Sequence, residues 1–248
     1  MSSENRSGGR LKIAFLGMND IGRRVWEYLK GRDEDDMAVI TDKVNAEMLR
    51  EFMPDLILSV GYRHILQKDI LSIPKMGAIN FHKSLLPLNR GANPVFWTLL
   101  DATRAGVSIH YMEEGVDTGP IIAQREVEVL NTDTASTLYA KLEAVQFELF
   151  KSVWPDIRNG NVEKRPQHGE PTLHTIKEFK ELRKIYPSQK VKISDFLNYL
   201  RAMTFPGFDN AYIEVAGKKY FIEIRVHEEG KPSEKNEAGT TLLKQYGF

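Results

Sequence analysis

The stretch KIAFL, residues 12–16, is a short run of apolar, β-prone residues near the beginning of the chain. After it, Ile21, Val25 and Leu29 recur at helical spacing, so the sequence predicts a strand, a turn and a helix in succession. The run DLILSV, residues 55–60, is apolar at nearly every position, as is typical of a strand with both faces covered. Such strands, alternating with helices, predict an α/β fold with a Rossmann-like, mostly parallel sheet.

Further segments continue this alternation as far as Pro155, which we expect to help end the last helix. Together with the first strand and helix they predict one domain over residues 11–163. The additional predicted elements are, in order, a weak strand over residues 37–41, a helix over 46–53, strands over 77–82 and 106–111, and a helix over 133–154.

The composition changes after this region. Residues 158–175 are rich in Asn, Gly, Pro, Gln and His, as in a linker, and we place a boundary near Lys164. Residues 164–248 are predicted to form a small α+β unit, and we expect a flexible leader over residues 1–10 and a mobile polar tail over 228–239. The predicted elements of the unit are a Ser194-capped helix ending at Met203 and a β-hairpin that runs over 211–215, turns at Ala216-Gly217 and returns over 218–226.

Composition excludes several classes of function. The 248 residues carry 34 basic and 34 acidic side chains, so no overall positive field favours a nucleic-acid partner. The chain has no cysteine, which rules out a thiolate nucleophile and suits the reducing cytoplasm. Residues 1–10 contain no apolar run for a signal peptide or membrane span, and the histidines lack HExxH-type spacing, so we expect neither a membrane nor a metal partner.

The segment GAINFHKSLLPLNRGANP, residues 77–94, concentrates residues that can carry out chemistry. Side chains alternate along a strand, so Asn80 and His82 are expected on the same side. A second stretch, GVDTG, places Asp117 in a Gly-bounded loop after another predicted strand. Loops at the carboxyl ends of parallel strands line one crevice, so we expect the three side chains to converge there. An amide donor, a proton-accepting imidazole and an orienting carboxylate are suited to acid–base chemistry.

These motifs resemble those of the 10-formyltetrahydrofolate-dependent formyltransferases. The family's N-x-H-x-S-L-L-P-x-x-x-G stretch corresponds to residues 80–91, and its G-V-D-T-G-x-I-I loop corresponds to residues 115–122. The resemblance covers roughly residues 12–154. It departs at Lys83, where the family usually has Pro, and at Asn89, where an aromatic residue is common.

The resemblance implies that Asn80, His82 and Asp117 form the catalytic group, acting as oxyanion donor, proton acceptor and orienting carboxylate. It implies 10-formyltetrahydrofolate as the co-substrate, with no metal. The pterin is then expected in a pocket formed mainly by backbone groups of Tyr62, Arg63, His64, Ile65, Leu66, Leu88, Asn89, Arg90, Val116 and Thr118.

The chain beyond Trp154 favours one branch of this family. A glycinamide-ribonucleotide enzyme would be complete shortly after its catalytic domain, and an initiator-tRNA enzyme normally has a larger C-terminal barrel with a basic surface. The resemblance therefore implies formylation of a nucleotide-linked amino sugar, of the dTDP or GDP type, by a cytoplasmic homodimer serving lipopolysaccharide O-antigen biosynthesis. The candidate substrate contacts are Lys83, Ser84 and Arg90, with Phe205, Phe208 and Tyr212 as places for a nucleotide base to stack.

Other interpretations stay open at this point. A methionyl-tRNA formyltransferase-like enzyme, or another small-amine formyltransferase, would share the catalytic motifs, and a formyl-folate hydrolase would need only water as acceptor. A non-catalytic folate- or nucleotide-sugar-binding module would keep the fold without turnover. The stretch over residues 17–22 is not a dinucleotide-binding motif, because Asn19 replaces the second glycine of G-x-G-x-x-G.

Overall fold

A six-stranded sheet forms the centre of the computed structural model, which describes residues 9–230. The strand order is β2-β1-β3-β4-β6-β7; the first four strands are parallel, and β6 and β7 run antiparallel to their neighbours. The strands are β1 (Lys12–Leu16), β2 (Asp36–Ile40), β3 (Leu56–Ser59), β4 (Ala78–His82), β6 (Ala105–Tyr111) and β7 (Ile121–Val127). The predicted mostly parallel α/β fold is confirmed, as are its first four strands.

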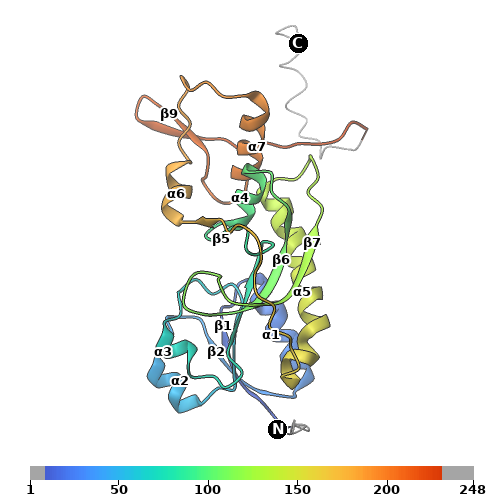
Figure 1. Cartoon of the computed structure of the whole chain (residues 1–248). Helices are drawn as coiled ribbons and strands as arrows, with labels where there is room; N and C mark the ends of the chain where they lie inside the picture. Colours follow the sequence, from blue (N-terminus) through green and yellow to red (C-terminus); the bar gives the residue numbers. More distant parts are fainter. Residues whose placement is uncertain (1–8, 231–248) are drawn as a thin grey trace.

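Helices cover both faces of this sheet because its strands are apolar on both sides. These helices are α1 (Asp20–Arg32), α2 (Ala46–Phe52), α3 (Lys68–Leu71) and α5 (Ala135–Asn159). In β1, Ile13 and Phe15 pack into the core beneath α1 and α5, whereas Ala14 and Leu16 pack beneath α2 and α3. Figure 1 shows α2 and α3 on one side of the strands and α1 with α5 on the other. None of the helices within residues 9–230 is long and apolar enough to cross a membrane.

The end of α5 and the neighbouring strands correct two expectations. Pro155 does not stop α5, which continues to Asn159 and ends at Gly160 with φ +71°. Pro155 lies on the exposed side of the helix, so the backbone hydrogen bond that proline cannot donate is missing where the helix faces solvent. Strand β7 was not predicted, because only Ile121, Ile122 and Ala123 at its start are buried and the rest is polar.

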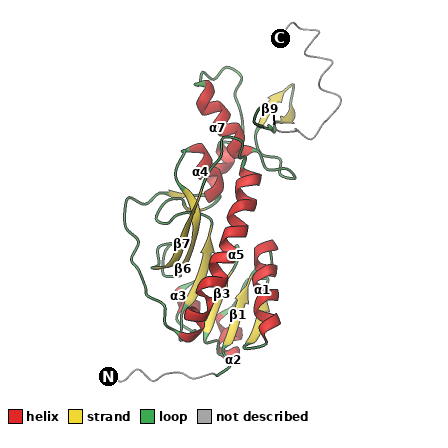
Figure 2. Cartoon of the chain, turned by 90° about the vertical axis from the view of Figure 1, so that its right-hand side faces the viewer, coloured by secondary structure: helices red, strands yellow, loops and turns green. Residues whose placement is uncertain are grey.

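The second unit is built from α6 (Ile176–Glu181), α7 (Ile193–Met203) and a hairpin of β9 (Tyr212–Val215) and β10 (Lys218–Phe221). Figure 2 shows α7 and β9 beyond the end of the sheet, with α7 beside α4 (Pro94–Leu100). The hairpin turn at Ala216 and Gly217 is confirmed, and both residues have the positive φ that a type I′ turn requires.

Three details of the second unit differ from expectation. Ser194 lies inside the first turn of α7, whose N-cap is Lys192. The returning strand ends at Phe221, five residues earlier than predicted from 218–226. Buried residues of α7, among them Leu200 and Met203, join the same core cluster as α4 and α5, so the two units share a core. Most of the predicted leader, and of the polar tail, lies outside the described residues.

Residues 160–175, between α5 and α6, form a connecting segment. It joins the two units through a short parallel pair of strands, β5 (Arg90–Gly91) and β8 (Leu173–His174). The backbone N–H of Arg90 donates to Thr172 O at 2.9 Å, and that of Ala92 donates to His174 O at 2.9 Å. In Figure 1 this segment passes in front of the sheet and reaches β5 before it enters α6. The second unit is therefore attached to the loop that follows the Asn80–His82 strand.

Candidate active site

Strand β4 and the loop between β6 and β7 bring the three predicted catalytic side chains together. Nδ2 of Asn80 lies 3.2 Å from Oδ1 of Asp117, and Nδ1 of His82 lies 3.4 Å from its Oδ2. The route differs from the expected one. Strand β6 is antiparallel to β4, so Asp117 reaches the site from a loop that folds back over β4 and not from the carboxyl end of a parallel strand.

His82 is buried and held in one tautomer. Its Nε2–H donates to the carbonyl of Asn89 at 2.8 Å, which leaves Nδ1 facing Asp117 as the nitrogen that can accept a proton. Burial lowers the pKa of His82, and the nearby Asp117 carboxylate offsets only part of this effect. The imidazole is therefore neutral near pH 7 and able to act as a base.

Asp117 is held as an anion. Burial would raise its pKa, but His82, His110 and a 2.8 Å hydrogen bond from the backbone N–H of Gly91 outweigh this effect, so the pKa lies well below the usual range. The residue adopts a left-handed conformation with φ +53°, which is uncommon outside glycine. A fixed negative charge beside His82 favours the protonated imidazole formed during proton transfer.

The side chain of Asn80 is oriented by Ser59 of the neighbouring strand β3. Its Oδ1 accepts a hydrogen bond from the Ser59 hydroxyl at 3.0 Å, so its Nδ2 points towards Asp117 and is a donor for developing negative charge. Nδ2 also lies 3.3 Å from Nε2 of His110, whose Nδ1–H donates to Tyr111 O. His110 was missed as a site residue because nothing local in the sequence shows that it pairs with Asn80 across β4 and β6.

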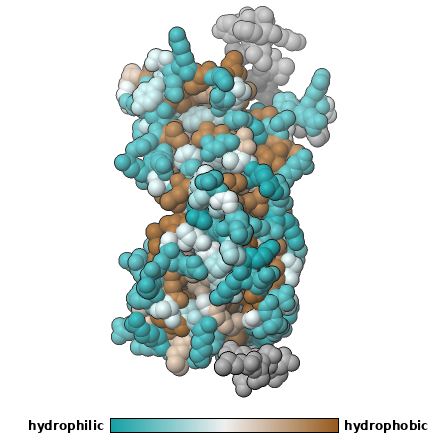
Figure 3. All heavy atoms as spheres, in the orientation of Figure 1, coloured by the Kyte–Doolittle hydropathy of each residue, from teal (hydrophilic) through white to brown (hydrophobic). Residues whose placement is uncertain are grey.

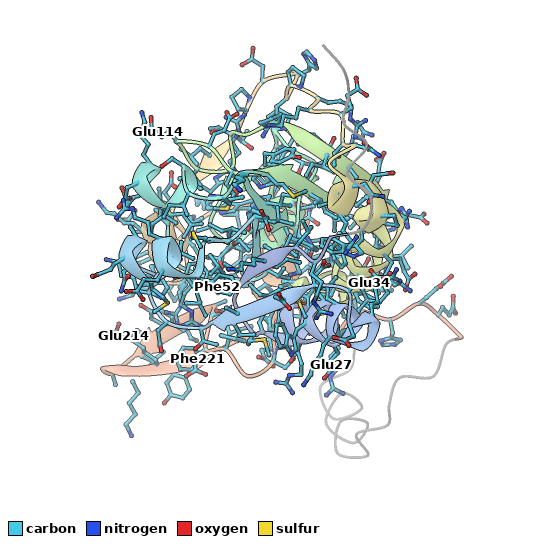
Figure 4. All side chains as sticks on the ribbon, turned by 90° about the horizontal axis from the view of Figure 1, so that it is seen from below. Glu27, Glu34, Phe52, Glu114, Glu214 and Phe221 are labelled. Atoms are coloured by element: carbon cyan, nitrogen blue, oxygen red, sulfur yellow. The ribbon has the colours of Figure 1, made fainter. Side chains whose placement is uncertain are left out.

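Two of the three segments expected to hold the pterin, residues 62–66 and 116–118, lie close to each other. Lys68 at the start of α3 forms a 3.0 Å ion pair with Glu114, which precedes Val116 in the loop over β4. Figure 4 shows Glu114 beside this helix. The side chains of Ile65 and Val116 are 71% and 39% exposed, so two apolar residues of these neighbouring segments face outward. The Tyr62 hydroxyl, in contrast, is bonded within the protein, to the backbone of residues 42 and 44.

Two of the residues expected to contact ligands, Asn89 and Ser84, are buried and hydrogen-bonded within the protein. Asn89 is 1% exposed: its carbonyl accepts from His82, its N–H donates to Thr172 Oγ1, and its side chain is bonded to three threonines. Ser84 is fully buried, and its hydroxyl donates to Leu88 O at 2.6 Å. Both residues hold the loop after β4 and are closed off from solvent, and their contact with a ligand stays a prediction.

The expected substrate contacts divide into two groups. The ammonium of Lys83 lies 3.4 Å from Glu143 and 4.2 Å above the Tyr139 ring of α5. Its charge is therefore paired within the protein, and it is not a second free cation beside Arg90. Phe205 packs edge-on against the same Tyr139 ring and against Phe208. Lys83, Tyr139, Phe205 and Phe208 therefore form one continuous array. Tyr212 does not belong to this array, since its ring packs on that of Phe221 in the hairpin. Phe221 is labelled in Figure 4.

A cavity of about 420 Å³ lies beside the Asp117 loop, between it and the connecting segment. Among its walls are Arg90 and Gln167, and the guanidinium of Arg90 donates to Gln167 Oε1 through Nη2 at 2.7 Å. Gln167 was not singled out in the sequence. Across residues 9–230, no group of three or more His, Asp or Glu side chains has an arrangement that could hold a metal ion.

The fold and site define a class of protein: a Rossmann-like domain that holds an amide, an imidazole and a carboxylate at one place, an arrangement suited to transfer of an acyl-type group. Residues 27–153 match the formyl transferase family, and the chain belongs to that family. Residues 178–228 match the N-formyltransferase dimerization C-terminal domain.

Known relatives include proteins with different acceptors. The chain is 33% identical over 190 residues to a dTDP-4-amino-4,6-dideoxyglucose formyltransferase of Mycobacterium tuberculosis, covering 76% of this chain and 79% of the relative. It is 36% identical over 185 residues to a methionyl-tRNA formyltransferase of Agathobacter rectalis, covering 74% of this chain but only 58% of that longer protein.

Solved structures of formyltransferases have a similar fold. A 4-N formyltransferase from Francisella tularensis superposes with a TM-score of 0.80 at 26% identity, covering 88% of this chain and 98% of the other. The formyltransferase PseJ from Anoxybacillus kamchatkensis, in complex with UDP-4,6-dideoxy-4-formamido-L-AltNAc and tetrahydrofolate, has a TM-score of 0.63 at 37% identity, covering 68% and 88%.

Proposed function

We propose that this protein transfers the formyl group of 10-formyltetrahydrofolate to the amine of a nucleotide-linked amino sugar. The observation that carries the proposal is the group formed by Asn80, His82 and Asp117, in which a neutral buried imidazole faces an ionised carboxylate beside an oriented amide. Membership of the formyl transferase family supports the nature of the transferred group.

In this proposal each side chain acts on a defined atom. The folate supplies the formyl carbon. Nδ1 of His82 removes a proton from the attacking amine nitrogen and returns it to the departing folate nitrogen, so the ring ends as it began. The amide N–H of Asn80 donates to the formyl oxygen as it becomes negative, and Asp117 stabilises the transiently protonated imidazole.

The folate is proposed to bind against the adjoining segments that contain residues 62–66 and 116–118. The exposed apolar side chains of Ile65 and Val116 offer a surface for a flat ring system, and backbone groups nearby can hydrogen-bond its edge. The exposed Lys68–Glu114 ion pair shows that the ends of the two segments lie close to each other. The complex of PseJ with tetrahydrofolate supports a folate site in this fold.

For the acceptor, two kinds of support converge. The dTDP-4-amino-4,6-dideoxyglucose formyltransferase covers three quarters of this chain, and PseJ was solved with a UDP-linked formamido sugar. The array of Lys83, Tyr139, Phe205 and Phe208 supplies aromatic faces, of which Phe208 is 63% exposed and open to stacking by a nucleotide base.

The second unit is proposed to form a homodimer, with its boundary to the catalytic domain near Lys164. The match of residues 178–228 to a dimerization domain supports this, and so do its large exposed apolar side chains, which include Ile193, Leu197 and Phe221. Figure 3 shows apolar surface on this upper part of the molecule. Cytoplasmic localisation and a place in O-antigen biosynthesis stay predictions of the sequence.

The test is an acceptor panel with the full-length protein. The protein is mixed with 10-formyltetrahydrofolate and one acceptor at a time: a dTDP-, GDP- or UDP-linked amino sugar, initiator tRNA or glycinamide ribonucleotide. Both tetrahydrofolate and the formylated product are quantified, with His82→Ala as control. We expect equal amounts of both products from at least one sugar nucleotide. Formylation of initiator tRNA or glycinamide ribonucleotide alone would refute the acceptor, folate release without formamide would indicate a hydrolase, and no turnover would indicate a binding module.

A further inference from the structure

Gln167, in the connecting segment, bonds with both of its amide atoms to the loops that carry the catalytic group. Its Nε2 donates to the carbonyls of Asp117 at 2.8 Å and Gly119 at 2.7 Å. Its Oε1 accepts from Nε of Arg90 at 3.2 Å and from Nη2 at 2.7 Å. One side chain thus uses two donated and two accepted hydrogen bonds to join segments about 50 and 77 residues away along the chain.

The Asp117 loop needs such support because its conformation is constrained. Asp117 has φ +53°, a region that non-glycine residues adopt at an energetic cost. Gly119 packs so closely that a Cβ there would collide with the carbonyl of Tyr111. The two carbonyls that Gln167 binds lie on either side of Thr118, so its amide fixes the turn at which the catalytic carboxylate leaves the backbone.

The oxygen of the Gln167 amide binds the side chain of Arg90, a residue of β5. Arg90 lies between Asn89, whose carbonyl accepts the Nε2–H of His82, and Gly91, whose N–H donates to Asp117. Holding the Arg90 side chain therefore fixes the short strand that orients both His82 and Asp117. Gln167 connects the two supports of the His82–Asp117 pair without contacting either reacting side-chain atom.

We propose that Gln167 is a positioning residue, through which the connecting segment of the second unit sets the alignment of Asp117 with His82. The proposal rests on the function proposed above for its kinetic consequence, but its structural part concerns His82 and Asp117 alone. It makes the catalytic site dependent on a residue outside the domain that carries the catalytic side chains.

The test compares three variants of the full-length protein. Gln167→Ala removes all four hydrogen bonds, and Gln167→Glu keeps the acceptor for Arg90 but not the donor to the two carbonyls. His168→Ala changes the exposed neighbouring residue of the same segment. We expect kcat to fall about 100-fold in both Gln167 variants with little change in KM or Tm, the size that a small misplacement of a catalytic group can produce. His168→Ala should match the wild type.

A second readout does not depend on turnover. The midpoint of the His82 ring titration, followed by NMR, should move in Gln167→Ala in the same direction as in Asp117→Asn, by a smaller amount, because both changes weaken the same ion pair. An unchanged midpoint together with unchanged kcat would overturn the proposal, as would a loss of kcat that only follows a loss of Tm. If the wild type transfers no formyl group and yet the midpoint moves, the proposed function fails while this inference stands.

Discussion

The backbone N–H of Gly91 donates a 2.8 Å hydrogen bond to the Oδ2 atom of Asp117, the oxygen that faces His82. Gly91 belongs to β5, which is paired with β8 of the connecting segment, so the Asp117 carboxylate is bonded to a strand pair that bridges the two units. The geometry of the site is thereby coupled to the attachment of the second unit.

The first prediction concerns this strand pair. Gly91 has φ +86°, and a Cβ there would collide with the carbonyl of His174, so Gly91→Ala must separate β5 from β8. We expect a loss of about 1–3 kcal/mol in unfolding free energy and a fall in kcat. Gly160→Ala is the matched control, because Gly160 has φ +71° in open space: it should cost about 1 kcal/mol and leave kcat unchanged. Equal kcat in both variants would contradict the coupling.

The second prediction concerns Asp117→Asn. The carboxylate raises the pKa of His82 against the larger effect of burial, so removing its charge lowers that pKa further. The acid limb of the kcat/KM profile, which reports protonation of the base, should therefore move to lower pH, and the plateau should fall by about 10²–10⁴-fold. A pH–rate series on both proteins measures this. Movement of the acid limb to higher pH would show that another group titrates.

The third prediction concerns stability and pH. The pKa of His82 is lowered in the folded state. Below an unfolded-state pKa of roughly 6.5, the unfolded chain therefore binds a proton at this residue that the folded protein does not bind, and the free energy of unfolding decreases as the pH decreases. Urea unfolding between pH 7 and 5 should show this loss, with a slope of at most about 1.4 kcal/mol per pH unit from this residue. His82→Gln should flatten the slope. His174, which has a lowered pKa from burial and acts in the same direction, is compared through His174→Gln.

The fourth prediction concerns Pro155, which lies in the interior of α5 on its exposed side. Proline there removes a backbone donor and costs a helix interior about 3 kcal/mol relative to alanine. Pro155→Ala should raise the free energy of unfolding, by about 1–3 kcal/mol because the unfolded chain also gains freedom. Chemical denaturation with unchanged kcat checks it. A lower free energy of unfolding would show that the proline is required for the helix path.

The parts of the fold predicted from sequence were those with a local signal. Strands β1 and β3 appear as apolar runs, α1 appears as a helical period, and the hairpin turn appears as Ala216-Gly217, where both residues need positive φ. The start of β7 is apolar for only three residues, so no periodicity marked it. The continuation of α5 past Pro155 depends on which side of the helix faces solvent, and this is decided by packing.

The candidate site divides in the same way. The positions of Asn80 and His82 on one side of a strand follow from the alternation of side chains, and the motifs around them indicated Asp117. The burial of Ser84 and Asn89, and the pairing of Lys83 with Glu143, depend on contacts with residues of β6, α5 and the connecting segment. No local pattern encodes those distances.

By itself the sequence determined the class of fold, the family and the side chains that can carry out the chemistry, because periodicity and short motifs are local properties of the chain. Only the tertiary structure decided how Asp117 reaches His82, through an antiparallel β6 and a loop that folds back over β4. It also decided that His110 hydrogen-bonds with Asn80 and Gln167 with the Asp117 loop, since hydrogen bonds between distant segments depend on the folded path of the backbone.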